Sequence, residues 1–126
     1  MHERSFTPVT ARQALDGLRP LAETLCRLYR RLERARPARI VADQAVDPTY
    51  FLLVARLYAA LTEIRRRGVW VDDLRAGRLV FPARRAGRRV MLSWQVGEPT
   101  LGFWRESGDA PGGRRPLDDD GPWEEG

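Results

Sequence analysis

The chain has 126 residues, a formal net charge of +5 and one cysteine, Cys26. This length predicts one domain with one hydrophobic core, and a lone cysteine excludes a disulfide framework and favours a reducing, cytoplasmic location. The longest apolar run, residues 50–55, is far too short to cross a bilayer, so we expect no membrane partner.

The first predicted element is a long amphipathic helix. Thr7 is expected to be its N-cap and Pro8 its first residue, where the missing N–H has no cost. Apolar residues then recur every three or four positions as far as Leu32. Pro20 is expected to bend this helix, and Pro37 is expected to end it.

A second amphipathic helix follows. Asp47 and Pro48 repeat the signal for a helix start, apolar residues recur through Ile64, and Gly68 is a typical C-terminal stop. Two amphipathic helices with a short connector predict an antiparallel helical hairpin over residues 6–67. Their apolar seams also allow a homodimer through the helices as an alternative to a monomer.

After the helices the apolar residues alternate, as they do in strands. Pro82 should make its strand an edge or end it early, and Arg84 to Gly87 read as a hairpin tip at which glycine is free to adopt positive φ. The pattern predicts an antiparallel β-meander over residues 68–106. The predicted strands are residues 69–71, 79–83, 89–96 and 101–105.

The expected fold is therefore α+β: a single domain over residues 1–117, in which the helical hairpin packs on the small meander and residues 107–117 are extended. Residues 118–126 form an acidic tail that is rich in Gly, Pro and Asp, and we expect it to be disordered. Its five acidic residues leave a charge of +10 on the remainder. One hypothesis is that the tail folds back and masks this basic body from polyanions.

Several short segments carry a family resemblance. They are Phe6-Thr7, Gly68-Val69, Asp72-Asp73, Phe81-Pro82-Ala83, Gly87-Arg88, Trp94, Gly97-Glu98-Pro99, Trp104, Gly113-Arg114 and Pro116-Leu117. In these residues the chain resembles, over about residues 6–117, the bacterial family catalogued as domain of unknown function 2203. The resemblance implies a small, cytosolic protein with a helical N-terminal half, and it supplies no catalytic residues.

Two positions depart from the pattern of that family, which usually has Cys where this chain has Ser93 and His where it has Arg105. On neighbouring strands such a Cys and His can share a metal or form a thiolate–imidazolium pair. Serine is a weak ligand and arginine cannot coordinate a cation. We therefore predict no metal, no cofactor and no catalytic residue, and whether relatives have an activity lost here stays open.

The best candidate for an anion-binding site is the hairpin tip. Arg84, Arg85, Arg88 and Arg89 lie within six residues without an acidic neighbour in sequence, and Arg114 could add to them. Such a cluster gives salt-dependent affinity for polyanions that does not depend on sequence. The alternative, which we favour, is that these arginines are simply solvated.

The remaining candidates lie around the sheet. Glu98, in the Gly-Glu-Pro turn, could pair with Arg105 or another guanidinium, although acidic residues in turns are more often caps. Trp104 either packs beneath the helices or the C-terminal segment, which we favour, or forms an exposed binding surface with arginine. The register of the hairpin decides whether Trp104 or Arg105 shares the face of Ser93.

These observations give three hypotheses of function. The first is a noncatalytic cytosolic binding or interaction module, whose partner is an unknown protein or a polyanion. The second is a weak RNA- or ribosome-associated protein that uses the arginine cluster. The third is a small enzyme around Glu98, Asp72 and Arg105; it has the least support, because the only histidine, His2, lies at the terminus and leaves no Ser–His or Cys–His arrangement in the fold.

Overall fold

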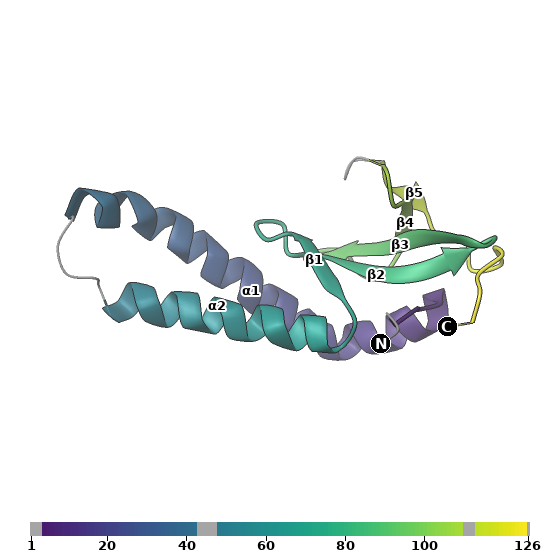
Figure 1. Ribbon diagram of the computed structural model, residues 1–126, viewed down its shortest axis with the longest axis horizontal. Helices are drawn as coiled ribbons and strands as arrows, with labels where there is room; N and C mark the ends of the chain where they lie inside the picture. The colour runs from purple at the N-terminus through teal and green to yellow at the C-terminus, as the bar shows by residue number, and fades with distance from the viewer. Residues whose placement is uncertain (1–3, 43–47, 110–112, 126) are drawn as a thin grey trace.

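The computed structural model describes residues 4–42, 48–109 and 113–125 (Figure 1). Two helices precede five strands, which pair in the sequential order of an antiparallel meander. The predicted α+β architecture is therefore confirmed. The elements are α1 (Pro8–Ala42), α2 (Pro48–Arg66), β1 (Trp70–Asp73), β2 (Arg78–Arg85), β3 (Arg88–Gln95), β4 (Phe103–Glu106) and β5 (Arg115–Pro116).

The start of α1 follows the prediction, whereas its end does not. The Thr7 hydroxyl accepts from the Thr10 N–H at 3.1 Å, and the Thr10 hydroxyl accepts from the Thr7 N–H at 2.8 Å, as in a capping box. The helix passes through Pro20 and continues beyond Pro37 to Ala42. Pro20 is exposed, so water can satisfy the carbonyl that its ring leaves without a donor. The prediction that Pro37 ends α1 is wrong, because the bias against helix before proline is only a preference.

The end of α2 is set by Gly68, as predicted. Its φ of +83° lies in the left-handed region, its N–H donates to the Arg65 carbonyl at 2.9 Å, and the Val69 N–H donates to the Ile64 carbonyl at 3.4 Å. This pair of bonds is a Schellman motif and turns the chain directly into β1. The predicted N-cap of α2, Asp47, lies outside the described residues. Within the described part of the chain, neither helix has the length and apolar character needed to span a membrane.

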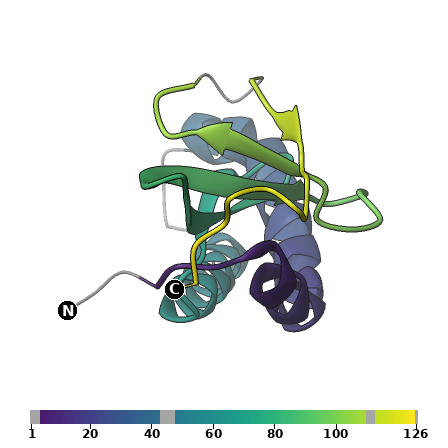
Figure 2. The same cartoon turned by 90° about the vertical axis from the view of Figure 1, so that its right-hand side faces the viewer.

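The sheet lies across the N-terminal half of α1, while the other half of α1 and most of α2 project beyond it (Figures 1 and 2). The core fills the space between these layers. Its largest fully buried side chains are Phe6, Leu15, Leu18, Leu25, Ile64, Leu79, Phe81, Leu92, Trp94 and Leu101. Trp94 is only 2% exposed, which confirms its predicted place in the core. The projecting part of the hairpin has no sheet above it.

Pro82 occupies an edge position although its strand has neighbours on both sides. β1 pairs with β2 only as far as Val80, and beyond that point the Phe6 N–H donates to the Pro82 carbonyl at 2.7 Å. Because the N–H and C=O of one strand residue point the same way, the missing N–H of Pro82 falls on the Phe6 side and not in the β2–β3 ladder. The prediction that Pro82 makes its strand an edge or ends it early is therefore wrong, because β2 is an inner strand that continues to Arg85; only the local position of Pro82 lies beyond β1.

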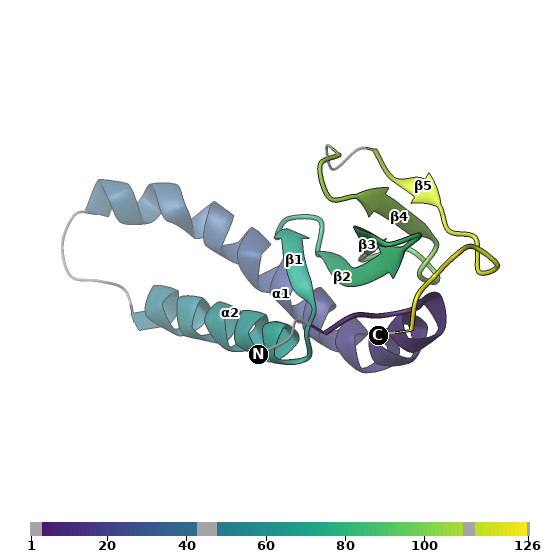
Figure 3. The ribbon, with the colours of Figure 1, turned by 45° about the vertical axis from the view of Figure 1, so that its right-hand side comes forward.

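The described tail residues differ from the expectation of disorder. The chain passes from β5 across the end of the sheet and down to the first turns of α1 (Figure 3). Trp123 forms a β-bridge with Arg85, and the Asp119 carboxylate lies 2.5 Å from Arg12. The low apolar content of this segment predicted disorder, but its charge is opposite to that of the body and Trp123 adds an apolar contact. The expectation is corrected for residues 118–125.

Candidate interaction surfaces

The outer face of the sheet, turned away from the helices, brings together several of the predicted site residues. Ser93 pairs with Phe103 and Met91 pairs with Arg105. Since alternate residues share a face, Ser93 and Arg105 lie on the outer face and Trp104 on the opposite one. The register that the sequence left open is thereby settled. Ser93 has no exposed surface, because the C-terminal segment covers it.

A clamp between Glu98 and Arg114 covers Ser93. The two guanidinium nitrogens Nη1 and Nη2 of Arg114 each lie 2.7 Å from a Glu98 carboxylate oxygen. Arg114 Nε donates to the Ser93 hydroxyl at 3.0 Å, and its guanidinium lies 4.2 Å from the centre of the Phe103 ring. Every nitrogen of this guanidinium therefore has a partner within the protein. The clamp fastens the C-terminal segment to β3 and to the turn after it.

The Glu98 carboxylate is held in its ionised form. Burial raises its pKa, but hydrogen bonds from Arg114 and from the Gln95 backbone N–H, together with the charges of Arg114 and Arg78, outweigh burial and leave the pKa below the usual value of 4.5. A carboxylate held in this way accepts hydrogen bonds and is unsuited to donate a proton at neutral pH. The geometry thus favours a structural role for Glu98.

This lowered pKa predicts a loss of stability in acid. The pKa of Glu98 lies lower in the folded than in the unfolded chain, so its contribution is complete above the unfolded pKa and disappears as the pH falls through the folded pKa. We expect the difference in unfolding free energy between the wild type and Glu98→Gln to shrink over this range. Urea denaturation of both proteins between neutral pH and about pH 3 measures it. A constant difference would contradict the assignment.

A second polar cluster lies beside the clamp. Arg105 Nη2 is 3.1 Å from Asp72 Oδ2, Arg78 Nη1 is 3.7 Å from Asp72 Oδ1, and Arg78 Nε donates to the Gln95 side-chain carbonyl at 3.1 Å. The predicted guanidinium partner of Glu98 is therefore Arg114 and not Arg105. Most of these polar groups bind one another, although Arg105 Nε is buried without a hydrogen-bond partner among the described residues. Among the described residues, no group of three or more His, Cys, Asp or Glu side chains is placed to hold a metal ion.

The hairpin tip forms where it was predicted, but its arginines form ion pairs with acidic residues from other parts of the chain. Ala86 and Gly87 have φ values of 52° and 77°, which is the type I′ turn that suits a two-residue hairpin loop. Acidic residues distant in sequence form ion pairs with tip arginines. The pairs are Arg84 with Glu124, Arg85 with Asp118, and Arg88 with Glu106. The structure thus supplies the acidic partners that the neighbouring sequence lacks.

Trp104 is 7% exposed and packs beneath the C-terminal segment, as favoured from the sequence. Its ring meets the ring of Trp123 edge to face with 5.8 Å between centroids. The Arg85 guanidinium lies 4.8 Å from the Trp104 centroid and 5.1 Å from the Trp123 centroid. The tail and the tip arginines therefore form one connected structure with Trp104.

The surface that sequence reasoning missed is a groove of about 410 Å³ between α1 and α2, called the helical groove below. It is lined by Leu21, Thr24, Arg27, Leu28, Arg31, Arg56, Ala59 and Ala60. Its floor is apolar, with Leu28 and Ala60 buried, and three arginines form its rim. The small Ala59 and Ala60 side chains leave the space open. The pair of alanines in the second helix was the sequence signal that could have indicated this groove. The sequence did not show, however, which side of the helical hairpin the sheet would cover.

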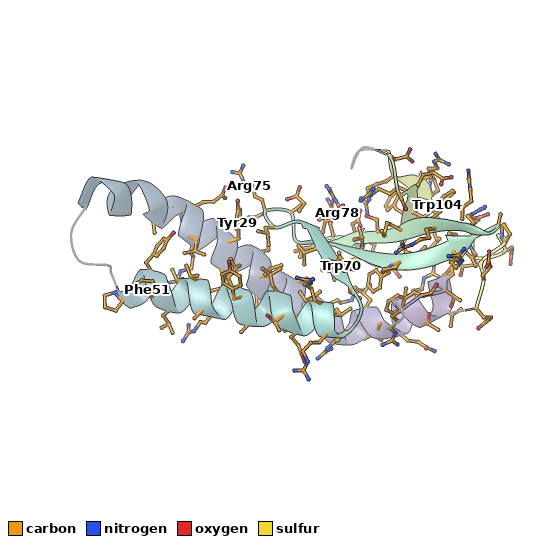
Figure 4. All side chains as sticks on the ribbon, in the orientation of Figure 1. Tyr29, Phe51, Trp70, Arg75, Arg78 and Trp104 are labelled. Carbon is orange, nitrogen blue, oxygen red and sulfur yellow. The ribbon has the colours of Figure 1, made fainter. Side chains whose placement is uncertain are left out.

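The outward side of α2 is also unusually apolar. Phe51, Leu52 and Tyr58 are 57%, 50% and 65% exposed, and Phe51 lies at the end of the hairpin farthest from the sheet (Figure 4). Leu52 precedes Arg56 by one turn and so lies on the helical-groove side of α2. A helix that is apolar on several sides is generally buried against another structure. This part of the hairpin therefore has the composition of a contact surface.

The fold and these surfaces define a small α+β protein in which a helical hairpin carries a meander sheet and projects beyond it. The family model described as "uncharacterized conserved protein (DUF2203)" matches residues 4–117, so the chain belongs to that family, as its resemblance predicted. No curated protein and no solved structure matches the chain. The family match ends at Leu117, which leaves the acidic tail outside it.

Proposed function

We propose that this protein is a noncatalytic interaction module that binds a helix of a partner protein in the helical groove. The observation that carries the proposal is an apolar floor, open between two helices, whose described lining residues all belong to α1 and α2. An amphipathic helix laid along such a groove completes a three-helix arrangement and buries the floor. Leu52 extends the apolar surface beyond the rim.

The rim of the groove indicates the charge of the partner. Arg27, Arg31 and Arg56 surround the floor, and none of the described residues that line it is acidic. Neither Arg31 nor Arg56 forms an ion pair with a described residue, and Arg27 donates to the Thr24 hydroxyl at 3.4 Å. The complementary ligand is a helix with an apolar stripe flanked by Asp or Glu. In a homodimer through this groove the rim arginines of one copy would lie opposite those of the other. Repulsion between these like charges disfavours such a dimer.

The competing functions have weaker support. Catalysis around Glu98, Asp72 and Arg105 would need groups free to exchange protons or hold substrate, whereas these side chains bind their own neighbours. Polyanion binding at the tip would have to displace Asp118 and Glu124 from their arginines. Binding of a helix in the helical groove requires neither of these rearrangements.

The substitution Ala59→Glu tests the proposal. It fills the groove and places a carboxylate among the three rim arginines, so partner binding should fall at least about tenfold while the fold is kept. The measurement is affinity capture from the cells of origin after nuclease treatment, with each bound protein quantified. Val9→Glu is the matched control, because Val9 is 58% exposed, lies near the start of α1 and receives the same charge.

The expected result is a protein with an acidic amphipathic helix that the wild type and Val9→Glu capture equally and that Ala59→Glu does not. Capture of one and the same set of proteins by all three forms would refute the proposal. Loss of the whole set after nuclease treatment would favour the RNA-associated alternative instead.

A further inference from the structure

We propose that the exposed edge of β2 at the hairpin tip is a second docking site, for an extended acidic peptide segment, and that residues 118–125 occupy it as a removable strap. The site, called the tip site below, consists of Arg12, residues 84–87 and Trp104. It shares no residue with the lining of the helical groove, and the proposal does not depend on that groove.

The backbone of the strap adds to the sheet as a short strand. The Glu124 N–H donates to the Arg84 carbonyl at 3.0 Å, and the Ala86 N–H donates to the Pro122 carbonyl at 3.0 Å. β1 has already ended at this point, and Phe6 covers the edge only as far as Ala83. Without the strap these backbone groups form an open strand edge, which is the feature that extended peptides recognise by strand addition.

The charges of the tip site are divided cleanly between body and strap. Arg12 donates to both Asp119 oxygens, at 2.5 and 2.9 Å, and Arg85 lies 2.8 Å from Asp118. Glu124 lies 3.7 Å from Arg84, and it also accepts from the Gly87 N–H. Hydrogen bonds from Arg12, which outweigh a small effect of burial, hold the pKa of Asp119 below its usual value. Every carboxylate in this set belongs to the strap.

An aromatic anchor completes the match. The Trp123 ring lies against Trp104 and against the Arg85 guanidinium, and its Nε1–H donates to the Asp118 carbonyl at 2.6 Å. Tryptophan and arginine are the side chains that most often dominate the energy of protein interfaces. The strap therefore shows what ligand the tip site takes: carboxylates, an extended backbone and one aromatic side chain.

The strap is suited to leave the site. The family match covers residues 4–117, which include the tip-site residues, and it ends before the strap. The Asp118 and Asp119 side chains are each 53% exposed and that of Glu124 is 42% exposed, so salt and competing anions weaken their pairs. An acidic segment of another protein can replace the strap contact by contact. A nucleic acid would offer the charge without the backbone groups that pair with the β2 edge.

The test uses the full chain in two forms, the wild type and a strap variant with Asp118→Asn, Asp119→Asn, Trp123→Ala and Glu124→Gln. The probe is a fluorescein-labelled synthetic peptide with the sequence of residues 117–126, followed by anisotropy. The strap variant should bind this peptide at least about tenfold more tightly than the wild type, because its site is no longer occupied. Binding should weaken as salt is raised, and a peptide with Asn and Gln for Asp and Glu should not bind.

Matched arginine variants locate the binding. In the strap-variant background Arg84→Ala should weaken peptide binding, whereas Arg88→Ala should not, because Arg88 pairs with Glu106 of β4. Equal peptide affinity for the wild type and the strap variant overturns the proposal. Tighter binding of single-stranded RNA than of the peptide to the strap variant overturns it as well.

Hydrogen exchange on the wild type tests the same proposal without any substitution, and it can be used if the strap variant does not fold. If the strap opens on its own, the Ala86 and Glu124 N–H groups exchange much faster than the N–H groups of the β2–β3 ladder. Exchange of both sets only through global unfolding shows that the strap is a permanent part of the fold, and it overturns the proposal.

Discussion

Replacing Glu98 with alanine is expected to lower the free energy of unfolding by about 3 kcal/mol, because it leaves a largely buried guanidinium without its counter-charge. The Arg114 side chain is only 14% exposed and that of Glu98 is 19% exposed, so water cannot fully replace the lost carboxylate. The Gln95 N–H loses its acceptor in the same step. Urea denaturation of the wild type and Glu98→Ala measures the cost.

A double-mutant cycle separates the interaction energy of the Glu98–Arg114 pair from the other destabilising effects of the two substitutions. Arg114→Ala should also destabilise, since it removes the bonds to Ser93 as well as to Glu98. In the double variant Glu98→Ala/Arg114→Ala no charge is left unpaired, so the combined loss should fall short of the sum of the single losses by about 1–3 kcal/mol. Simple additivity would show that the two side chains do not act as a pair.

The second large effect is expected at Gly77, in the loop between β1 and β2. Gly77 has a φ of +64°, and a Cβ there would lie 2.6 Å from Val96 Cγ2 and 3.3 Å from Cys26 Cβ. Gly77→Ala should therefore cost about 2–3 kcal/mol, from left-handed backbone strain and from overpacking, chiefly against Val96 and less against Cys26 of α1. Chemical denaturation measures this loss.

Gly87→Ala is the matched control. Gly87 has a similar φ of +77°, but a Cβ there would have no neighbour within 4 Å. Its substitution should cost only about 1 kcal/mol, from the backbone alone. The difference between the two variants measures how tightly the loop packs against Val96 and Cys26. Equal losses would mean that this packing adds nothing to stability.

Local signals in the sequence predicted most of the fold. The Thr7 cap, the Gly68 stop and the hairpin tip with positive φ at Gly87 depend on neighbouring residues only, and each is found as expected. The continuation of α1 past Pro37 and the ordering of the tail were missed. The continuation of α1 overrides the weak preference against helix before a proline. The ordering of the tail depends on contacts with Arg12 and Arg85, which are far away in the sequence.

The candidate sites were harder to predict, because each ion pair could form with any of many chemically equivalent side chains. Glu98 was correctly expected to need a guanidinium, but among 22 arginines the sequence gives no reason to select Arg114. The tip arginines lacked acidic neighbours in sequence and found them through the tail. The described residues that line the helical groove come from α1 and α2, and which side of these helices the sheet leaves open is decided by packing and not by periodicity.

Site-specific photo-crosslinking in the cells of origin tests the central claim most directly. A photoreactive amino acid replaces Leu52, beside the helical groove, in one form of the protein and Val9, distant from it, in another; both side chains are at least half exposed. Mass spectrometry identifies what each position captures. The account predicts that position 52 crosslinks to an acidic amphipathic helix of one partner protein and that position 9 does not. Crosslinks from position 52 to RNA, to a second copy of this chain, or to the same proteins as position 9 would contradict it.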